Sequence, residues 1–461
     1  MSLDGEANPG AGFWRPFRGA GSLIVTVVAT RTPLASAIRT VVTRATVLSI
    51  NLGTGILIAR SLGPEGRGQL AAIGLGVGFF ASLLSFGLPS SIVFNIKRHP
   101  EERPALLAAV FLMALALGLI AIPPGLALIP HWLGSYPPEI RWAARLFMFQ
   151  APMILLVPVC HAALEASGEF TLSNLAWFAS PALSLVFLGL LALLETNVTP
   201  LRVALAVVAG GVLPLGWMFV LLWRYRPSLS GLRSAARHLA GYGSRAYAID
   251  LVVALAGQVD QILVVGMLTS RGAGSYVVAV SVTRVLAVVQ ASVATVLFPF
   301  ASGRSTEEAV AAVALATRWV LIFTAFGCAF LFAVGPALLV LVYGPDFTAA
   351  ASLLRILLVE ALLSSMVAIL AQSFMALARP GWVAVSQLAG VALEVPLMLI
   401  LIPRFGLAGA GTALLIASAL RLILILASYP LVLRVPVPRL WLGSDDVTML
   451  REALISLRER R

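Results

Sequence analysis

Charged and hydrogen-bonding side chains interrupt the apolar stretches of this chain at helical spacing. Arg44 is followed seven residues later by Asn51, and a helix places both on nearly the same face. A later apolar stretch carries a polar stripe that ends in a proline: Ser281, Arg284, Ser292, Thr295 and Pro299. A charge in the middle of a membrane costs roughly 2.5 to 3.5 kcal/mol on insertion scales, so each needs a cavity, a partner or a function. The stripes therefore predict a polar interior.

A second set of polar residues includes acids. The seventh and eleventh apolar stretches contribute, in order, Asp250, Gln258, Asp260, Gln261, Gln387 and Glu394. We take the following residues as candidates for ion coupling or for gating: Asp250, Asp260, Gln261, Glu394, Pro89 and Pro299. The two prolines are expected to bend their helices. Structural alternatives stay open, because Asp260 could simply pair with Arg284, and Arg44 could reach out to lipid headgroups.

The remaining reactive residue types give no catalytic or metal-binding pattern. The four histidines are scattered singly, and the two cysteines, Cys160 and Cys328, lie inside apolar segments. Acids and bases do not converge in the sequence as a catalytic centre requires. We therefore expect no metal, no cofactor and no enzymatic activity.

Composition indicates the setting of these residues. The chain has 461 residues, of which 60% are hydrophobic and 11% charged, and its mean hydropathy is +0.98. Soluble domains have roughly 25% charged residues, so this is a membrane protein. A span takes about 20 apolar residues, and about twelve can be drawn. Their approximate bounds are 39–60, 69–94, 105–129, 141–163, 172–194, 201–223, 246–268, 275–299, 314–342, 350–376, 381–402 and 407–430.

The second half of the chain repeats the first. The motif that begins Gly66-Arg67-Gly68 returns as Gly272-Ala273-Gly274, an offset of 272 − 66 = 206 residues. The repeat predicts an all-α protein with two six-helix lobes in like orientation, the layout of a transporter that rocks one half against the other. The expected domains are a tail (1–38), an N-lobe (39–224), a basic linker (225–245), a C-lobe (246–430) and a second tail with a short amphipathic helix (431–461).

Basic residues indicate the orientation in the membrane. They gather before residue 40, at 97–103, at 224–245 and after 434, whereas the intervening loops carry single arginines such as Arg67. Cytoplasmic loops retain positive charge, so both termini are expected in the cytoplasm. The net charge of +12 then reflects topology and contact with anionic membrane lipids rather than nucleic-acid binding.

Two local motifs resemble a known family. Residues 59–72, ARSLGPEGRGQLAA, with FGLP at 86–89, resemble the junction of the first two helices in polysaccharide flippases of the multidrug/oligosaccharidyl-lipid/polysaccharide superfamily. VYGPDF at 342–347 and ASLLRIL at 351–357 resemble the connection between that family's ninth and tenth helices. The resemblance covers nearly all of residues 40–430.

The resemblance implies a fold and a function. Its members are V-shaped pairs of six-helix lobes, as in the multidrug exporters of the same superfamily. They move an undecaprenyl-diphosphate-linked oligosaccharide from the inner to the outer leaflet of the bacterial cytoplasmic membrane by alternating access, for surface polysaccharides such as O-antigen, lipopolysaccharide or exopolysaccharide. Polysaccharide polymerase and glycosyltransferases would be partners, alongside the lipid-linked oligosaccharide and membrane lipids.

The residues for the lipid-linked headgroup would be Arg44, Arg284, Asn51, Ser281, Ser292 and Thr295. A guanidinium binds phosphate oxygens with paired hydrogen bonds, and the polar stripes accommodate sugar hydroxyls.

Two other functions are weighed beside the flippase. A cation-coupled multidrug antiporter of the same superfamily typically has a carboxylate in its first helix. This chain has Arg44 and Asn51 there and no acid, so coupling would fall to Asp260 or Glu394. A membrane glycosyltransferase, ligase or polymerase for the same lipid would need a long outer loop or clustered acids and bases, and neither is present.

Overall fold

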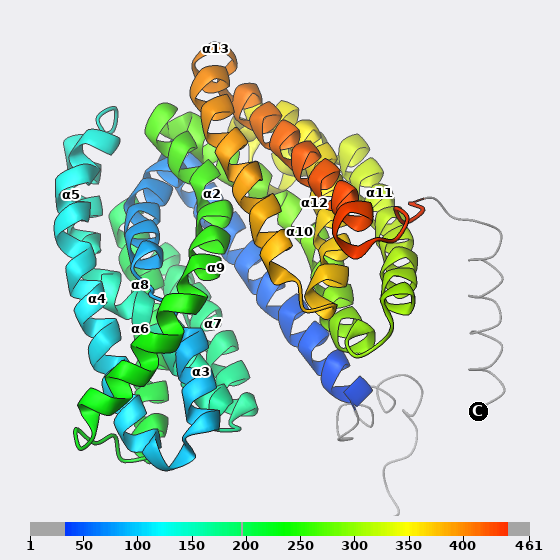
Figure 1. Ribbon diagram of the computed structural model, residues 1–461. Coiled ribbons are helices and arrows are strands. Elements are labelled where there is room, and N and C mark those ends of the chain that lie inside the picture. The colour runs from blue at the N-terminus through cyan, green and yellow to red at the C-terminus, as the bar shows by residue number, and fades with distance from the viewer. Residues whose placement is uncertain (1–32, 195–196, 441–461) are drawn as a thin grey trace, which may run out of the picture.

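The computed structural model describes residues 33–194 and 197–440, with side chains from Thr46 onward except those of Ile249, Val253 and Pro299 (Figure 1). Its elements in that part of the chain are helical. The first half holds α2 (Pro33–Leu83), α3 (Leu88–Arg98), α4 (Arg103–Trp132), α5 (Pro138–Phe147), α6 (Ala151–Ala166), α7 (Phe170–Leu194) and α8 (Pro200–Trp223). The second half holds α9 (Leu232–Met267), α10 (Ser270–Ala301), α11 (Thr306–Tyr343), α12 (Ala349–Ala376) and α13 (Pro380–Ser428). Short turns at Pro100–Glu102, Met148–Gln150, Pro345–Phe347 and Tyr429–Leu433 extend or join them.

Ten continuous helical stretches of the described chain are long and apolar enough to cross a membrane. Two of them, α2 and α13, are broken inside by a glycine with positive φ, Gly63 (φ 64°) and Gly406 (φ 56°). Glycine adopts this conformation without the steric penalty of a side chain, so the chain reverses there. Each broken helix therefore holds two spans, and the ten stretches correspond to the twelve that were expected. The predicted fold class is confirmed.

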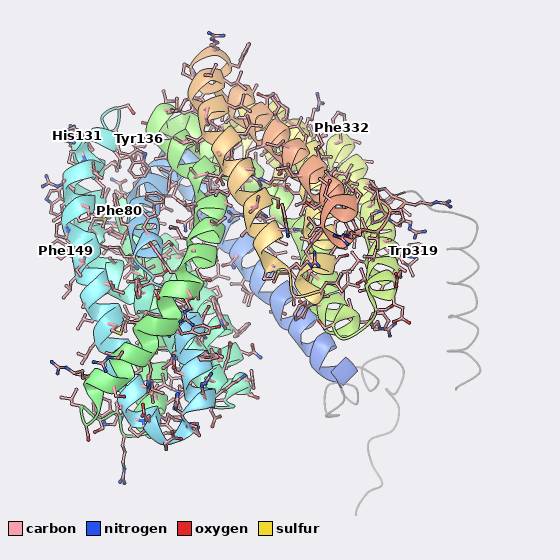
Figure 2. All side chains as sticks on the ribbon, in the orientation of Figure 1. Phe80, His131, Tyr136, Phe149, Trp319 and Phe332 are labelled. Carbon is pink, nitrogen blue, oxygen red and sulfur yellow. The ribbon has the colours of Figure 1, made fainter. Side chains whose placement is uncertain are left out.

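The helices form two groups that meet at the top of Figure 1 and diverge toward the bottom. Helices α4 to α8 make one group and α10 to α13 the other, with α2 and α9 running between them. The outer faces carry exposed apolar side chains such as Phe149 (62% exposed) and Phe332 (48% exposed), shown at the periphery in Figure 2. Surfaces this apolar are expected where lipid replaces water.

The repeated glycine motifs lie against each other. A Cβ atom built on Gly68 would lie 1.8 Å from the Ser270 carbonyl oxygen, and one on Gly274 would lie 1.8 Å from that of Pro64. Helices α2 and α10 therefore cross with their backbones in contact, as small residues allow in membrane proteins. The sequence repeat thus forms the joint between the two halves.

The two prolines that were expected to bend helices lie near helix ends. Pro89 does not bend a helix: α2 ends at Leu83, Gly87 (φ 63°) precedes the next helix, and Pro89 lies in the first turn of α3. Proline suits that position, because the first backbone N–H groups of a helix have no partner within it. Pro299 lies in the last turn of α10, and its side chain is outside the described residues.

The expected linker of residues 225–245 is partly helical. Helix α9 begins at Leu232 and runs without a break into the seventh span. Its first turns bury Ala235 and Leu239 and contact α3 and α4. The structure describes the second tail only as far as residue 440, so it does not test the short amphipathic helix expected there.

Candidate functional site

A cavity of about 650 Å³ lies between the two halves. Its walls come from both parts of α2, from α8 and from α10, with α5 and α6 closing one side. Six polar residues line it: Asn51, Thr54, Arg67, Gln150, Ser281 and Arg284. None of the described lining residues is acidic, so the cavity has a positive potential.

The cavity brings together half of the headgroup residues expected from the sequence. Asn51, Ser281 and Arg284 line it, whereas Ser292 and Thr295 lie farther along α10, outside its lining. Ser292 donates a hydrogen bond to the Val288 carbonyl oxygen (2.7 Å), and Thr295 donates one to the Ala291 carbonyl oxygen (2.8 Å).

Arg44 lies on α2, on the same helix as Asn51. Its side chain is outside the described residues.

Arg67 is the cavity residue that sequence reasoning missed. The pattern of basic residues predicts an outer loop here, but the second part of α2 begins directly after the break at Gly63, so Arg67 lies inside a helix. Its buried Nε has no hydrogen-bond partner among the described residues. Nearby, the Tyr343 hydroxyl lies 3.4 Å from Ser281 Oγ. The available signal was the glycine on each side of Arg67, which marks a close helix crossing rather than a loop.

The two halves are held together at the end where α2 turns at Gly63. Arg60 donates hydrogen bonds to the carbonyl oxygens of Val342 (2.8 Å) and Leu341 (2.6 Å) at the end of α11. The Trp132 indole N–H of α4 donates to the Ile262 carbonyl oxygen of α9 (3.0 Å). Together with the glycine crossing, these contacts hold the two halves together at this end.

Helix α9 also follows α2 and α3 along one side. Gln258 donates a hydrogen bond to Ser82 Oγ (3.0 Å), and Ser91 donates one to the Leu239 carbonyl oxygen (2.8 Å). Phe94 and Tyr242 stack with their ring centroids 4.2 Å apart. The lining of the cavity includes α10 and not α9. The cavity therefore does not lie along these contacts of α9 with α2 and α3.

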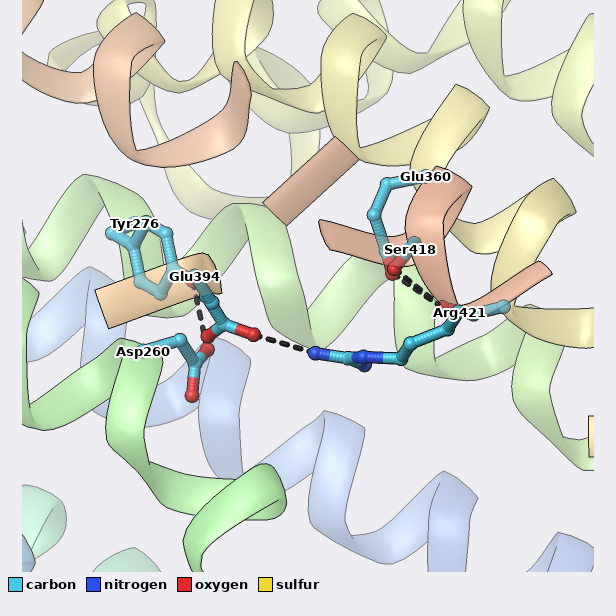
Figure 3. A network of polar contacts seen from close by, with 7 residues as sticks. Asp260, Tyr276, Glu360, Glu394, Ser418 and Arg421 are labelled. Carbon is cyan, nitrogen blue, oxygen red and sulfur yellow. Dashed lines mark hydrogen bonds and ion pairs between the residues drawn. The ribbon is translucent and has the colours of Figure 1, made fainter. Parts of the chain in front are cut away.

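A separate network of acids occupies the interior of the second half (Figure 3). Asp260 accepts a hydrogen bond from the Tyr276 hydroxyl (2.8 Å). Glu394, 1% exposed, forms an ion pair with Arg421 at 2.5 Å. Glu360 accepts hydrogen bonds from Ser418 Oγ (2.7 Å) and from Ser364 Oγ.

The candidates for ion coupling that were expected from the sequence lie in different parts of the molecule. Asp260 and Glu394 lie in this network. The hydrogen bond of Asp260 comes from Tyr276, and Arg284, which lines the cavity, also acts on the Asp260 carboxylate electrostatically. Asp250 faces α3, where Ser90 Oγ lies 3.5 Å away, and Gln261 is half-buried beside Asp260. Glu360 and Arg421 were missed, although each is a charge inside a predicted span.

Known proteins share this architecture. The family model for "Polysaccharide biosynthesis protein" matches residues 57–352. A segment of 163 residues is 31% identical to the "Probable low-salt glycan biosynthesis flippase Agl15" of Haloferax volcanii and covers 34% of each chain.

Two solved structures share the fold. The lipid II flippase MurJ in an inward closed conformation has a TM-score of 0.70 and 15% identity, over 84% of this chain and 86% of that one. A multidrug resistance MATE family transporter of the MOP superfamily in an inward-facing conformation has a TM-score of 0.66 and 17% identity, over 82% and 92%. At these identities the likeness concerns the fold. The family match spans well over half of the chain, so this multi-pass membrane protein belongs to the polysaccharide biosynthesis family and has the fold of the multidrug/oligosaccharidyl-lipid/polysaccharide superfamily.

Proposed function

We propose that this protein moves an undecaprenyl-diphosphate-linked oligosaccharide from the inner to the outer leaflet of the bacterial cytoplasmic membrane. The observation that carries the proposal is the pairing of Arg67 and Arg284 in a cavity whose described lining holds no acid. A diphosphate needs cationic donors shielded from bulk water, where charge-assisted hydrogen bonds are stronger. A site for cationic drugs would need the opposite charge.

The other lining residues suit the sugar. Asn51, Gln150 and Ser281 offer amide and hydroxyl groups that can exchange hydrogen bonds with sugar hydroxyls. Arg44, two helical turns from Asn51 on α2, would meet the headgroup on its way in. The isoprenoid chain would remain in the bilayer beside the lobes, because it is as apolar as the lipid tails.

The joined end supports a direction for transport. The distribution of arginines favours the turn at Gly63 on the outer face and both termini in the cytoplasm. With Arg60 and Trp132 holding that end shut, the cavity would load from the cytoplasm. Release outside requires those contacts to break, which is alternating access.

The membrane potential can drive the loaded state outward. Each elementary charge that crosses is worth about 2.3 kcal/mol per 100 mV, and a diphosphate carries negative charge away from a negative cytoplasm. Asp260 and Glu394 are the candidates for coupling to an ion, and the candidates for coupling or gating also include Asp250, Gln261, Pro89 and Pro299. Polymerase and glycosyltransferases would act on the same lipid before and after this step.

The test is translocation of a fluorescent undecaprenyl-diphosphate oligosaccharide in proteoliposomes. Arg67→Ala and Arg284→Ala should each slow translocation at least tenfold, because a hydrogen bond to a charged group contributes about 1.5 to 3 kcal/mol. Arg404→Ala, at an exposed arginine outside the cavity lining, is the matched control and should transport normally. Wild-type rates in both cavity variants would reject the site.

The acids of the second half also keep a multidrug antiporter as a second candidate, since Glu394, a carboxylate that is 1% exposed, could bind the cation that drives drug export. Cation-driven efflux of a cationic dye from the same proteoliposomes, with no movement of the lipid-linked sugar, would favour that function instead.

A further inference from the structure

A second cavity, of about 740 Å³, lies in the first half beside the turn of α2 at Gly63. The starts of α5 and α8 and the second part of α2 form its walls. The lining includes Gln69, Pro138, Glu139, Trp142, Thr199 and Pro200. We call this cavity the end pocket. Among the described residues, its lining has no member in common with the cavity between the halves.

The end pocket and the cavity between the halves lie in series along the same three helices. The paired lining residues, end pocket first, are Ala143 and Phe147 on α5, Leu201 and Ala204 on α8, and Gln69 and Leu70 on α2. Three or four residues of a helix rise by roughly 4.5 to 6 Å, which is close to the length of one sugar unit. Because α5 and α8 both begin at the end pocket, it is the one nearer the Gly63 end. A substrate with its diphosphate in the cavity can therefore reach the end pocket with its sugars once that end opens.

The two cavities differ in charge. Arg67 and Arg284 make the cavity between the halves cationic, whereas Glu139 is the one charged residue in the described lining of the end pocket. The neighbouring Arg202 lies outside that lining, and its guanidinium donates a hydrogen bond to the Asn197 carbonyl oxygen (2.9 Å). A carboxylate repels a phosphate but accepts hydrogen bonds from neutral hydroxyls. The charges thus follow the order of a lipid-linked glycan, in which an anionic diphosphate precedes the sugars.

The end pocket offers the groups that bind sugar rings. Trp142 is 59% exposed, and its indole has neither a ring contact nor a hydrogen bond within the described part of the chain. The Glu139 carboxylate likewise has no hydrogen bond or ion pair among the described residues. The Gln69 amide donates to Glu65 (3.4 Å), which leaves its carbonyl oxygen open to a donor. An indole face packs against the C–H face of a sugar, while its N–H and the carboxylate bind hydroxyls.

We infer that the end pocket binds neutral sugar units of the transported glycan on the side where the glycan is released. The cavity between the halves holds the diphosphate and the first sugars, and the end pocket takes sugars farther along the chain. The inference rests on the proposed function and adds a second binding site to it. The protein then favours glycans that are long enough to reach from one site to the other.

The first test measures binding of lipid-free bacterial surface oligosaccharides, displayed on an array, by the full-length protein in nanodiscs. We expect the wild type to bind a subset of neutral oligosaccharides. Trp142→Ala should bind them about tenfold more weakly, a loss of about 1.4 kcal/mol, because it removes the aromatic face and the N–H donor. Trp223→Ala, at a tryptophan that is 69% exposed at the far end of α8, is the matched control and should bind as the wild type.

Two results of this test would overturn the inference. One is an array on which the wild type binds no glycan, and the other is equal binding by the wild type and Trp142→Ala. Titration of geranylgeranyl diphosphate into the same nanodiscs tests the cavity between the halves separately. Failure of the wild type to bind it would reject the proposed function, whereas the array alone decides the role of the end pocket.

The second test compares translocation of undecaprenyl diphosphate carrying a single sugar with that of the same lipid carrying an oligosaccharide. The ratio of the two rates, long glycan over short, should fall in Trp142→Ala by a factor similar to the loss of binding. Equal slowing of both substrates would indicate a general defect and would overturn the inference. A phospholipid that co-purifies with the wild type but not with Trp142→Ala, at an unchanged ratio, would identify a lipid site and overturn it as well.

Discussion

The cavity between the halves is cationic and open, whereas the interior of the second half is mainly acidic and packed. The cavity carries Arg67 and Arg284 without a described acid in its lining, whereas the interior network carries Asp260, Glu360 and Glu394 around Arg421. The arginines of the cavity have open space beside them, while Glu394 and Arg421 are packed and paired. This difference separates a site that can exchange a large ligand from a packed network that can hold helices together or exchange a small ion.

The largest effect is expected in the acidic interior. Arg421→Ala leaves Glu394 buried without a partner, and breaking such a pair costs about 3 to 5 kcal/mol. The thermal unfolding temperature of the protein in detergent should fall by several degrees. The double variant Arg421→Gln with Glu394→Gln should recover most of the loss, because it removes both charges. An unchanged unfolding temperature in the single variant would show that the pair does not stabilise the fold.

The next effect belongs to the cavity. Arg67→Glu places an acid where the described lining has none, and it should weaken binding of an isoprenoid diphosphate at least a hundredfold, since an attractive charge becomes a repulsive one. Arg67→Lys keeps the charge but loses the paired donors, so its loss should be smaller. The measurement is isothermal titration in nanodiscs. Comparable affinity in all three proteins would remove Arg67 from the site.

A smaller effect is expected at the crossing of α2 and α10, which joins the two halves near the turn at Gly63. Gly68→Ala introduces a Cβ that would lie 1.8 Å from the Ser270 carbonyl oxygen, and overpacking of this kind costs about 1 to 3 kcal/mol. The closed arrangement should be weakened, so labelling of a cysteine introduced at Thr54, which lines the cavity, should become faster from the outer side. Gly189→Ala, whose Cβ would meet nothing within 4 Å, is the control. Identical labelling rates would show that the crossing does not hold the end shut.

The smallest effect tests the edge of the cavity. Ser292 belongs to the predicted stripe, but it lies outside the lining and its hydroxyl bonds to its own helix. Ser292→Ala should change transport less than twofold, as is usual for substitutions within about 0.5 kcal/mol. A tenfold loss would mean that the substrate extends farther along α10 than the cavity does.

Much of the fold could be predicted from particular residues. Apolar length predicted the spans, and the repeated glycine motif predicted two like halves, because both depend on the local sequence and on what a bilayer demands. Asn51, Ser281 and Arg284 were found in the same way, as polar residues on single helices. The exact position of the break at Gly63 was not predicted. Arg67 was therefore predicted in a loop, although it lies in a helix.

The sequence by itself determined that this chain crosses a membrane as paired helical halves with cationic and acidic residues inside them. Only the tertiary structure decided which of those residues meet. Helical periodicity places residues on a face of their own helix, but it says nothing about which face of which neighbour lies opposite. Glu394 and Arg421, 27 positions apart, are joined because α13 folds back on itself at Gly406, and Arg284 joins Arg67 in one cavity because α10 crosses α2 at Gly68. Those contacts follow from the packing of whole helices, and glycine permits the close approach that this packing needs. A single stretch of sequence does not determine how two helices pack.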